Sequence, residues 1–137
     1  MIKGPIWKDE LTVNVKEIDE QHKKLFAIIN QTIDIYENRS DDICEVMRDL
    51  VDYTIYHFST ELEYMAEHNY YNYIAHHKEH QDFTNKINDF ISKLDEETVS
   101  KNKKALAKEL IILFRDWYLN HILNADRKLG RFLADRV

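Results

Sequence analysis

Apolar residues recur every three or four positions along four stretches of the chain, which is the spacing that puts them on one face of an α-helix. The stretches predict four helices of similar length, over about residues 20–36, from a cap at Ser40, Asp41 or Asp42 to about residue 68, over about 71–94, and from about 101 to at least 129. Asp19 is the expected N-cap of the first helix and Gly130 a candidate end of the last. The apolar face of the fourth helix is expected to hold Leu106, Leu110, Leu113, Trp117 and His121.

Short connections separate the four predicted helices, and short connections force neighbouring helices to run antiparallel. The expected fold is therefore all-α, an antiparallel up-down-up-down four-helix bundle. Gly4-Pro5 breaks any helix near the N-terminus, and Leu11, Val13 and Val15 alternate with polar residues. Residues 1–18 are accordingly expected to form an extended arm, and residues 19–137 the bundle, within one domain that spans residues 1–137.

Composition agrees with helices and narrows the classes of function. The chain has 2 Gly and 1 Pro, too few for the turns of β-rich folds or for glycine-rich phosphate loops. A net charge of −6 with scattered Lys and Arg argues against nucleic-acid binding. The single Cys44 cannot form an internal disulfide, and no signal peptide or membrane span is expected. We therefore expect a soluble cytoplasmic protein, as a monomer or weak oligomer.

Histidines and a carboxylate interrupt the apolar faces of the helices. The i, i+4 pairs His57 with Glu61 and His76 with His80 each point two side chains from one helix face at a common position. A carboxylate in a dry core is costly unless it is paired, and no Lys or Arg shares these faces. A bound cation is the simplest partner for this set, which comprises His22, His57, Glu61, His76, His80 and His121.

These residues are also expected at one level of the bundle. His57 and Glu61 lie late in the second helix and His76 and His80 early in the third, at similar distances from the intervening turn. Asp126 follows His121 by five residues, about 140° around an ideal helix. It reaches the same point only by a long reach or through a widened, π-type turn, so spacing alone leaves Asp126 open.

Four motifs carry a family resemblance: I-D-E-Q-H-K-K-L-F at 18–26, H-F-S-T-E at 57–61, H-H-K-E-H at 76–80 and W-Y-L-N-H-I-L-N-A-D at 117–126. With these motifs the chain resembles the hemerythrin family, most closely its single-domain bacterial members. The resemblance implies two iron ions with a bridging oxo or hydroxo group, and it adds Asp126 to the ligands. By analogy, His76, His80 and His121 serve one iron, His22 and His57 serve the other, and Glu61 and Asp126 bridge both.

The resemblance further implies reversible dioxygen binding at one open position on the second iron, for oxygen storage, delivery or sensing, rather than enzymatic turnover. The residues it implies for the dioxygen pocket are Leu25, Phe58, Trp117, Tyr118 and Ile122. Tyr118 departs from the family, whose members commonly carry an aliphatic residue there. We therefore hypothesise that its hydroxyl alters how the oxygen adduct decays.

Two other functions stay open on the sequence. The same iron pair could serve a redox enzyme that reduces nitric oxide or peroxide, and imidazole ligands also suit a structural zinc pair. Oxygen delivery or signalling would in addition require a separate protein partner.

Overall fold

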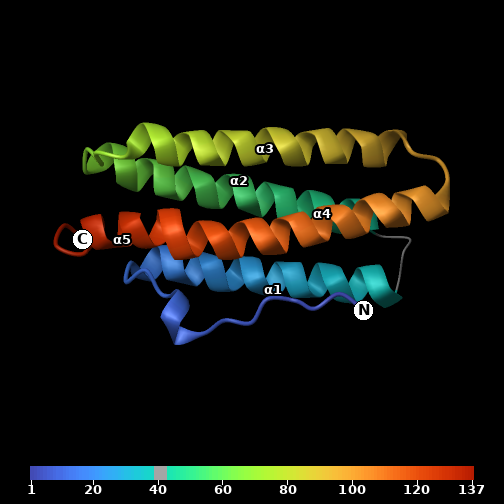
Figure 1. Cartoon of the computed structure of the whole chain (residues 1–137), viewed down its shortest axis with the longest axis horizontal. Coiled ribbons are helices and arrows are strands. Elements are labelled where there is room, and N and C mark those ends of the chain that lie inside the picture. The colour runs from blue at the N-terminus through green and yellow to red at the C-terminus, as the bar shows by residue number, and fades with distance from the viewer. Residues whose placement is uncertain (39–42) are drawn as a thin grey trace.

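The computed structural model describes residues 1–38 and 43–137, and helices are the regular elements throughout these ranges. The elements are the 3-10 turn η1 (Asp9–Leu11), the helices α1 (Lys16–Asn38), α2 (Ile43–Glu67), α3 (Tyr73–Glu96) and α4 (Ser100–His121), the π-helical turn η3 (Ile122–Asp126) and the helix α5 (Arg127–Leu133). Figure 1 shows the long helices α1, α2, α3 and α4 side by side, with α5 prolonging α4. The predicted all-α antiparallel bundle is confirmed, whereas the predicted cap at 40–42 lies outside the described residues.

Each long helix packs against two neighbours around a shared centre. α1 contacts α2 and α4, and α3 contacts the same two helices. Apolar residues at the three- and four-residue spacing are buried along α1 and α2, as expected, whereas the face expected for α4 is partly wrong. Leu113 and Trp117 are only half-buried, while Phe114 and Tyr118 are fully buried. The face of α4 is thus rotated by about one residue, which the continuous apolar runs at 110–114 and 117–119 permitted.

The N-terminal arm covers residues 1–15 rather than the predicted 1–18, because α1 begins at Lys16 rather than near residue 20. Asp19 is therefore not the N-cap. Its carboxylate lies in the first turn and accepts hydrogen bonds from the Val13 N–H at 2.8 Å and the Thr12 hydroxyl at 2.5 Å. Asn14, with a φ of 63°, supplies the left-handed turn between arm and helix. Asp19 thus fastens the arm to the helix that follows it.

Gly130 does not end the last helix, which continues through it to Leu133. The glycine is needed for close packing, since a Cβ at this position would lie 2.2 Å from the backbone oxygen of Val13. Val13 and Val15 are buried at this crossing of the arm over α5. Gly130, which the sequence suggested as a helix end, therefore serves the close contact between the arm and the helix.

The turn between α2 and α3 sets the level of the candidate site. Asn69 takes a left-handed φ of 54°, and the Tyr70 N–H reaches back to the Met65 carbonyl at 2.9 Å. This six-residue closure is the Schellman ending of a helix. It reverses the chain so that Glu61 and His76 face one another at a distance of 3.0 Å.

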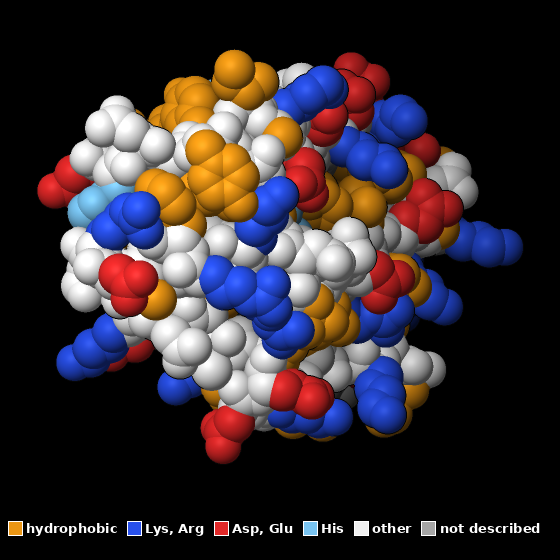
Figure 2. All heavy atoms as spheres, turned by 60° about the vertical axis from the view of Figure 1, so that its left-hand side comes forward, with side chains coloured by type: hydrophobic (Ala, Val, Ile, Leu, Met, Phe, Trp, Pro, Cys, Tyr) orange, Lys and Arg blue, Asp and Glu red, His pale blue; other side chains and the backbone are white. Residues whose placement is uncertain are grey.

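The candidate site is a polar layer between two apolar clusters. The larger cluster includes Leu25, Phe58 and Ile122, and the smaller one, toward the end where the chain terminates, includes Ile18 and Leu129. In the described ranges, no helix has the length and apolar character needed to cross a bilayer. On the face shown in Figure 2, Lys and Arg side chains are interspersed with Asp and Glu, so that this face carries no continuous basic surface.

Candidate metal centre

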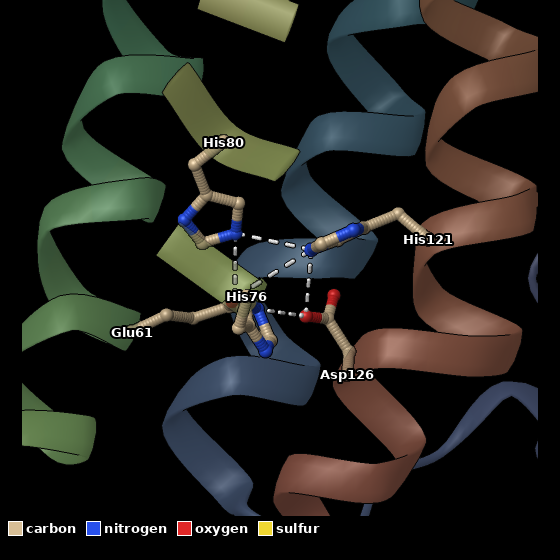
Figure 3. Close-up of side chains that lie close together, drawn as sticks. All are labelled: Glu61, His76, His80, His121 and Asp126. Carbon is tan, nitrogen blue, oxygen red and sulfur yellow. Dashed lines mark hydrogen bonds and ion pairs between the residues drawn. The ribbon is translucent and has the colours of Figure 1, made fainter. Parts of the chain in front are cut away.

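The seven residues that the sequence analysis singled out as metal ligands lie together in the bundle interior. All four long helices of the bundle contribute: α1 supplies one residue, α2 two, α3 two, and α4 together with its continuation η3 the last two. Each of these residues is at most 3% exposed. Figure 3 shows five of them converging on one point from three of these helices. They fall into two overlapping groups whose donor atoms lie within 4.8 Å of one another: Glu61, His76, His80, His121 and Asp126, and His22, His57, Glu61 and Asp126.

Both carboxylates divide their two oxygens between these groups. Oε2 of Glu61 faces His57 Nε2 at 2.9 Å and His22 Nε2 at 3.5 Å, whereas Oε1 faces the nitrogens of His76 and His80 at 3.0 and 3.2 Å. Asp126 repeats the pattern. Its Oδ2 lies 2.9 Å from His22, and its Oδ1 lies 3.2 Å from His76 and 3.0 Å from His121. One oxygen of each carboxylate thus serves a two-histidine half and the other a three-histidine half.

Asp126 joins the cluster because the helix widens after His121. Residues Ile122–Asp126 form the π-helical turn η3, and an extra residue per turn brings Asp126 onto the face that His121 occupies. Spacing left this residue open, and the widened turn is the alternative that the structure adopts. Such turns are frequent at functional sites, since an ordinary helix does not place i and i+5 on one face.

The electrostatics of the site are those of a compact, buried set of mutually paired groups. Burial opposes charging of His22 and His76, but the adjacent carboxylates of Asp126 and Glu61 outweigh it and raise the pKa of each imidazole to about 9. For His121 the same competition raises the pKa to about 10. Burial, with the charges of the neighbouring imidazoles, lowers the pKa of His80 to about 4.

The two carboxylates stay ionised inside the bundle. Burial and their mutual repulsion act to raise the pKa of Asp126, yet the imidazoles around it hold that pKa well below its usual range. The imidazoles do the same for the pKa of Glu61, against the effect of burial. In the described ranges neither carboxylate has a Lys or Arg partner. Among the residues that the structure describes, the charge of this pair is balanced by imidazoles.

The donor atoms fit a metal better than they fit one another. All five imidazoles turn Nε2 toward the carboxylates. Nevertheless His22 Nε2, His57 Nε2, Glu61 Oε2 and both Asp126 oxygens lack a hydrogen bond of acceptable geometry within the described part of the chain. Buried polar atoms without partners are rare and costly. Nitrogen and oxygen donors aimed at a shared point are the chemistry of a first-row transition-metal site, and iron fits such a set.

Comparison with known proteins agrees with this geometry. The family model described as hemerythrin HHE cation binding domain matches residues 13–133. The chain belongs to the hemerythrin family. The bacteriohemerythrin of Clostridium acetobutylicum is 30% identical over 128 residues, which cover 90% of this chain and 96% of that protein. The bacteriohemerythrin of Pseudomonas aeruginosa PAO1 is 32% identical over 122 residues, which cover 88% of this chain and 76% of that protein.

The fold agrees as well. A crystal structure of wild-type hemerythrin matches with a TM-score of 0.77 at 27% identity, over 93% of this chain and 95% of that one. The resemblance that the four sequence motifs suggested is confirmed. As the family implies, this hemerythrin carries a His, Glu and Asp cluster suited to a metal.

Two residues that the sequence analysis did not single out contact the outer nitrogens of ligand histidines. The Gln21 carbonyl accepts from His57 Nδ1 at 2.7 Å, and the Glu79 carboxylate accepts from His121 Nδ1 at 3.4 Å. Each directly precedes a candidate ligand in sequence, and each contacts a histidine of a neighbouring helix. Their place beside a ligand in the motifs was the available signal. The sequence did not show which histidine each residue contacts, because that histidine belongs to another helix.

The five residues implied for the dioxygen pocket all lie near the cluster, but on different sides of it. Trp117 stacks on His121 at 4.3 Å between ring centroids, beside the three-histidine half. Phe58 stacks on His80 at 3.9 Å and also lies 6.1 Å from His57. The ring of Tyr118 lies 6.4 Å from that of His57, and its buried hydroxyl has no hydrogen-bond partner in the described ranges.

Leu25 and Ile122, the other two implied pocket residues, are fully buried. Leu25 stands three residues after His22 on α1, and Ile122 directly follows His121 at the start of η3. Both belong to the larger apolar cluster that adjoins the site. Apolar side chains of this kind bound the polar layer on one side.

Proposed function

We propose that this chain is a reversible dioxygen-binding protein with a centre of two iron ions. His76, His80 and His121 hold one iron, His22 and His57 hold the other, and Glu61 and Asp126 bridge the pair. The observation that carries the proposal is the division of both carboxylates, each with one oxygen toward either half. A carboxylate that paired with only one ion would not need both its oxygens in this arrangement.

The unequal halves support binding of one small ligand. The three-histidine half offers five protein donor atoms and the two-histidine half four. The two-histidine half would thus leave an iron bound there with room for one small ligand that the three-histidine half would not offer. Bound there, ferrous iron would supply reversible, electron-donating binding of dioxygen. The protein contributes the fixed donors and restricts the ligand to one side of the centre.

The surrounding side chains are proposed to form a dry pocket. Leu25, Phe58, Tyr118 and Ile122 are buried, and Trp117 closes the cluster from the three-histidine side. Apolar walls would exclude the water and protons that promote irreversible oxidation of bound iron. The Tyr118 hydroxyl is the polar exception in this wall, and we propose that it affects the rate of that conversion.

A binding protein fits better than an enzyme, because five imidazoles with two carboxylates and apolar walls favour the return of dioxygen unchanged. Storage, delivery and sensing all use this one property. Delivery or sensing would draw on a separate protein partner, while storage would not.

The test is a metal analysis with visible spectra of the anaerobically reduced protein, before air, after air, and after deoxygenation. We expect two irons per chain and an absorption band that appears in air and disappears on deoxygenation. Irreversible conversion in air would favour the redox-enzyme alternative, and zinc in the fresh protein would remove the dioxygen proposal.

A pair of adjacent histidines on α3 gives the matched control. His76→Gln removes a proposed ligand and should lower the iron content, while His77→Gln should not. His77 is half-buried and stacks on Tyr73 at 5.6 Å rather than facing the cluster. Equal iron contents in the two variants would contradict the assignment.

A further inference from the structure

We infer that Gln21 is a positioning residue, which fixes His57 with its proton on Nδ1 and its Nε2 lone pair toward the centre. The inference rests on the proposed metal centre and concerns a residue that binds no metal itself. Gln21 lies on α1 and is 6% exposed, and its carbonyl is 2.7 Å from His57 Nδ1 on α2. The opposite nitrogen of the same ring lies 2.9 Å from Glu61 Oε2.

The orientation of the Gln21 amide is set by Thr60. The Thr60 hydroxyl has one proton, and it donates that proton to the Tyr56 carbonyl at 3.3 Å. It therefore meets Gln21 as an acceptor, and the Gln21 Nε2 donates to it at 3.0 Å. With its amino group committed to Thr60, Gln21 presents its carbonyl oxygen to His57. A carbonyl can only accept, so the His57 Nδ1 must carry the proton.

These contacts leave Nε2 as the atom of His57 that can bind a metal. An imidazole whose Nδ1 donates to a carbonyl has its Nε2 free to bind a metal, which is how outer partners fix the tautomer of a ligand histidine. The contact also holds the ring plane, because the amide is itself anchored at its other end. Turning the amide over would set its amino group against the donating nitrogen of His57 and break two buried hydrogen bonds at once.

No other ligand histidine has an equivalent partner in the described ranges. The Nδ1 atoms of His22, His76 and His80 have none, and the partner of His121 is the Glu79 carboxylate, whose side chain is 48% exposed and 3.4 Å away. The buried, doubly anchored contact thus falls on the half with only two histidines. Misplacing one of two imidazoles costs that half more than misplacing one of three would cost the other.

The experiment is a zinc titration of the metal-free chain against a competing chelator, with Gln21→Met compared to Gln31→Met. Methionine keeps the length of the side chain and removes both hydrogen bonds, and Gln31 is an exposed glutamine of the same helix. Gln21→Met should weaken one of two zinc ions by about 10–100-fold and leave the other unchanged. Gln31→Met should leave both unchanged, and a merely structural loss would weaken both ions together.

Nitrogen-15 spectra of the zinc-loaded wild-type chain provide a second readout, since zinc is diamagnetic. His57 should carry its proton on Nδ1, and a proton on Nε2 would overturn the inference. Thr60→Val keeps the shape of the threonine but frees the Gln21 amide to turn, and it should weaken the same zinc ion by a smaller factor. If Gln21→Met does not fold, this variant and the spectra decide.

The outcomes separate this inference from the proposed function. A wild-type chain that binds fewer than two zinc ions refutes the two-metal centre. A wild-type chain that binds two, with Gln21→Met indistinguishable from Gln31→Met, refutes the positioning role alone.

Discussion

Loading metal into the metal-free protein at pH 7 should release about three protons from imidazoles. The carboxylates raise the pKa of His22 and His76 to about 9 and that of His121 to about 10. At pH 7 a group with a pKa of 9 is roughly 99% protonated. An imidazole must lose this proton before its Nε2 can bind a metal. Because the pKa of His80 lies at about 4, that residue contributes none.

The pH dependence has opposite signs for metal affinity and for the stability of the metal-free bundle. Apparent metal affinity should rise steeply from pH 7 to 9, since fewer protons have to be displaced. The raised pKa values of His22, His76 and His121 contribute stability that is fully present below about pH 6.5 and is lost as the pH rises through 9 to 10. The thermal midpoint of the metal-free protein should therefore fall over the range in which its affinity for metal increases.

Calorimetric titration with zinc in two buffers of different ionisation enthalpy measures the number of protons released. The release should be about three at pH 7 and should decline as the pH approaches 10. Proton resonances of the metal-free imidazoles provide the control, with three of them titrating above pH 8.5. A release near zero at pH 7, or one that does not decline with pH, would refute the argument that the carboxylates hold these imidazoles charged.

Three substitutions test other parts of the structure. Gly130→Ala should lower the free energy of unfolding in urea by about 1–2 kcal/mol, because the clash of the added Cβ with Val13 costs more than the gain in helix propensity of about 1 kcal/mol. A more stable variant would contradict the crossing of the arm over α5. Tyr118→Phe should slow the conversion of the air-exposed, iron-loaded protein to its ferric form roughly tenfold, because the variant lacks the hydroxyl and one hydrogen bond to a charged group is worth about that factor. Phenylalanine in place of the exposed Tyr56 should leave this rate unchanged. Equal rates in the two variants would remove the role given to the Tyr118 hydroxyl. Glu61→Gln should weaken both zinc ions in chelator competition, in contrast to Gln21→Met, because Glu61 faces both halves; loss of only one would contradict its bridging position.

The sequence by itself determined the helices and most of the site. Helical periodicity is a local property, and the spacing of apolar residues placed the core faces of α1 and α2 and most of that of α3. The i, i+4 pairs His57 with Glu61 and His76 with His80 required only that local geometry. Short connections then fixed the antiparallel order, which brought the six residues placed by spacing to one level. The same local signals misplaced the start of α1. An Asp just before an apolar pattern is typical of an N-cap, but the carboxylate of Asp19 instead accepts hydrogen bonds from the arm.

The tertiary structure decided whatever depends on two segments meeting. The widened turn η3 carries Asp126 to the cluster, and i, i+5 spacing could not choose between that turn and an ordinary helix. The packing of α4 brought Tyr118 rather than Trp117 into full burial, because the apolar runs at 110–114 and 117–119 allow either face of this part of the helix to turn inward. Gly130 marks the crossing of the arm over α5, and Gln21 on α1 contacts His57 on the neighbouring helix α2. Such contacts follow from the relative rotation and approach of helices, which packing sets and which no local pattern encodes.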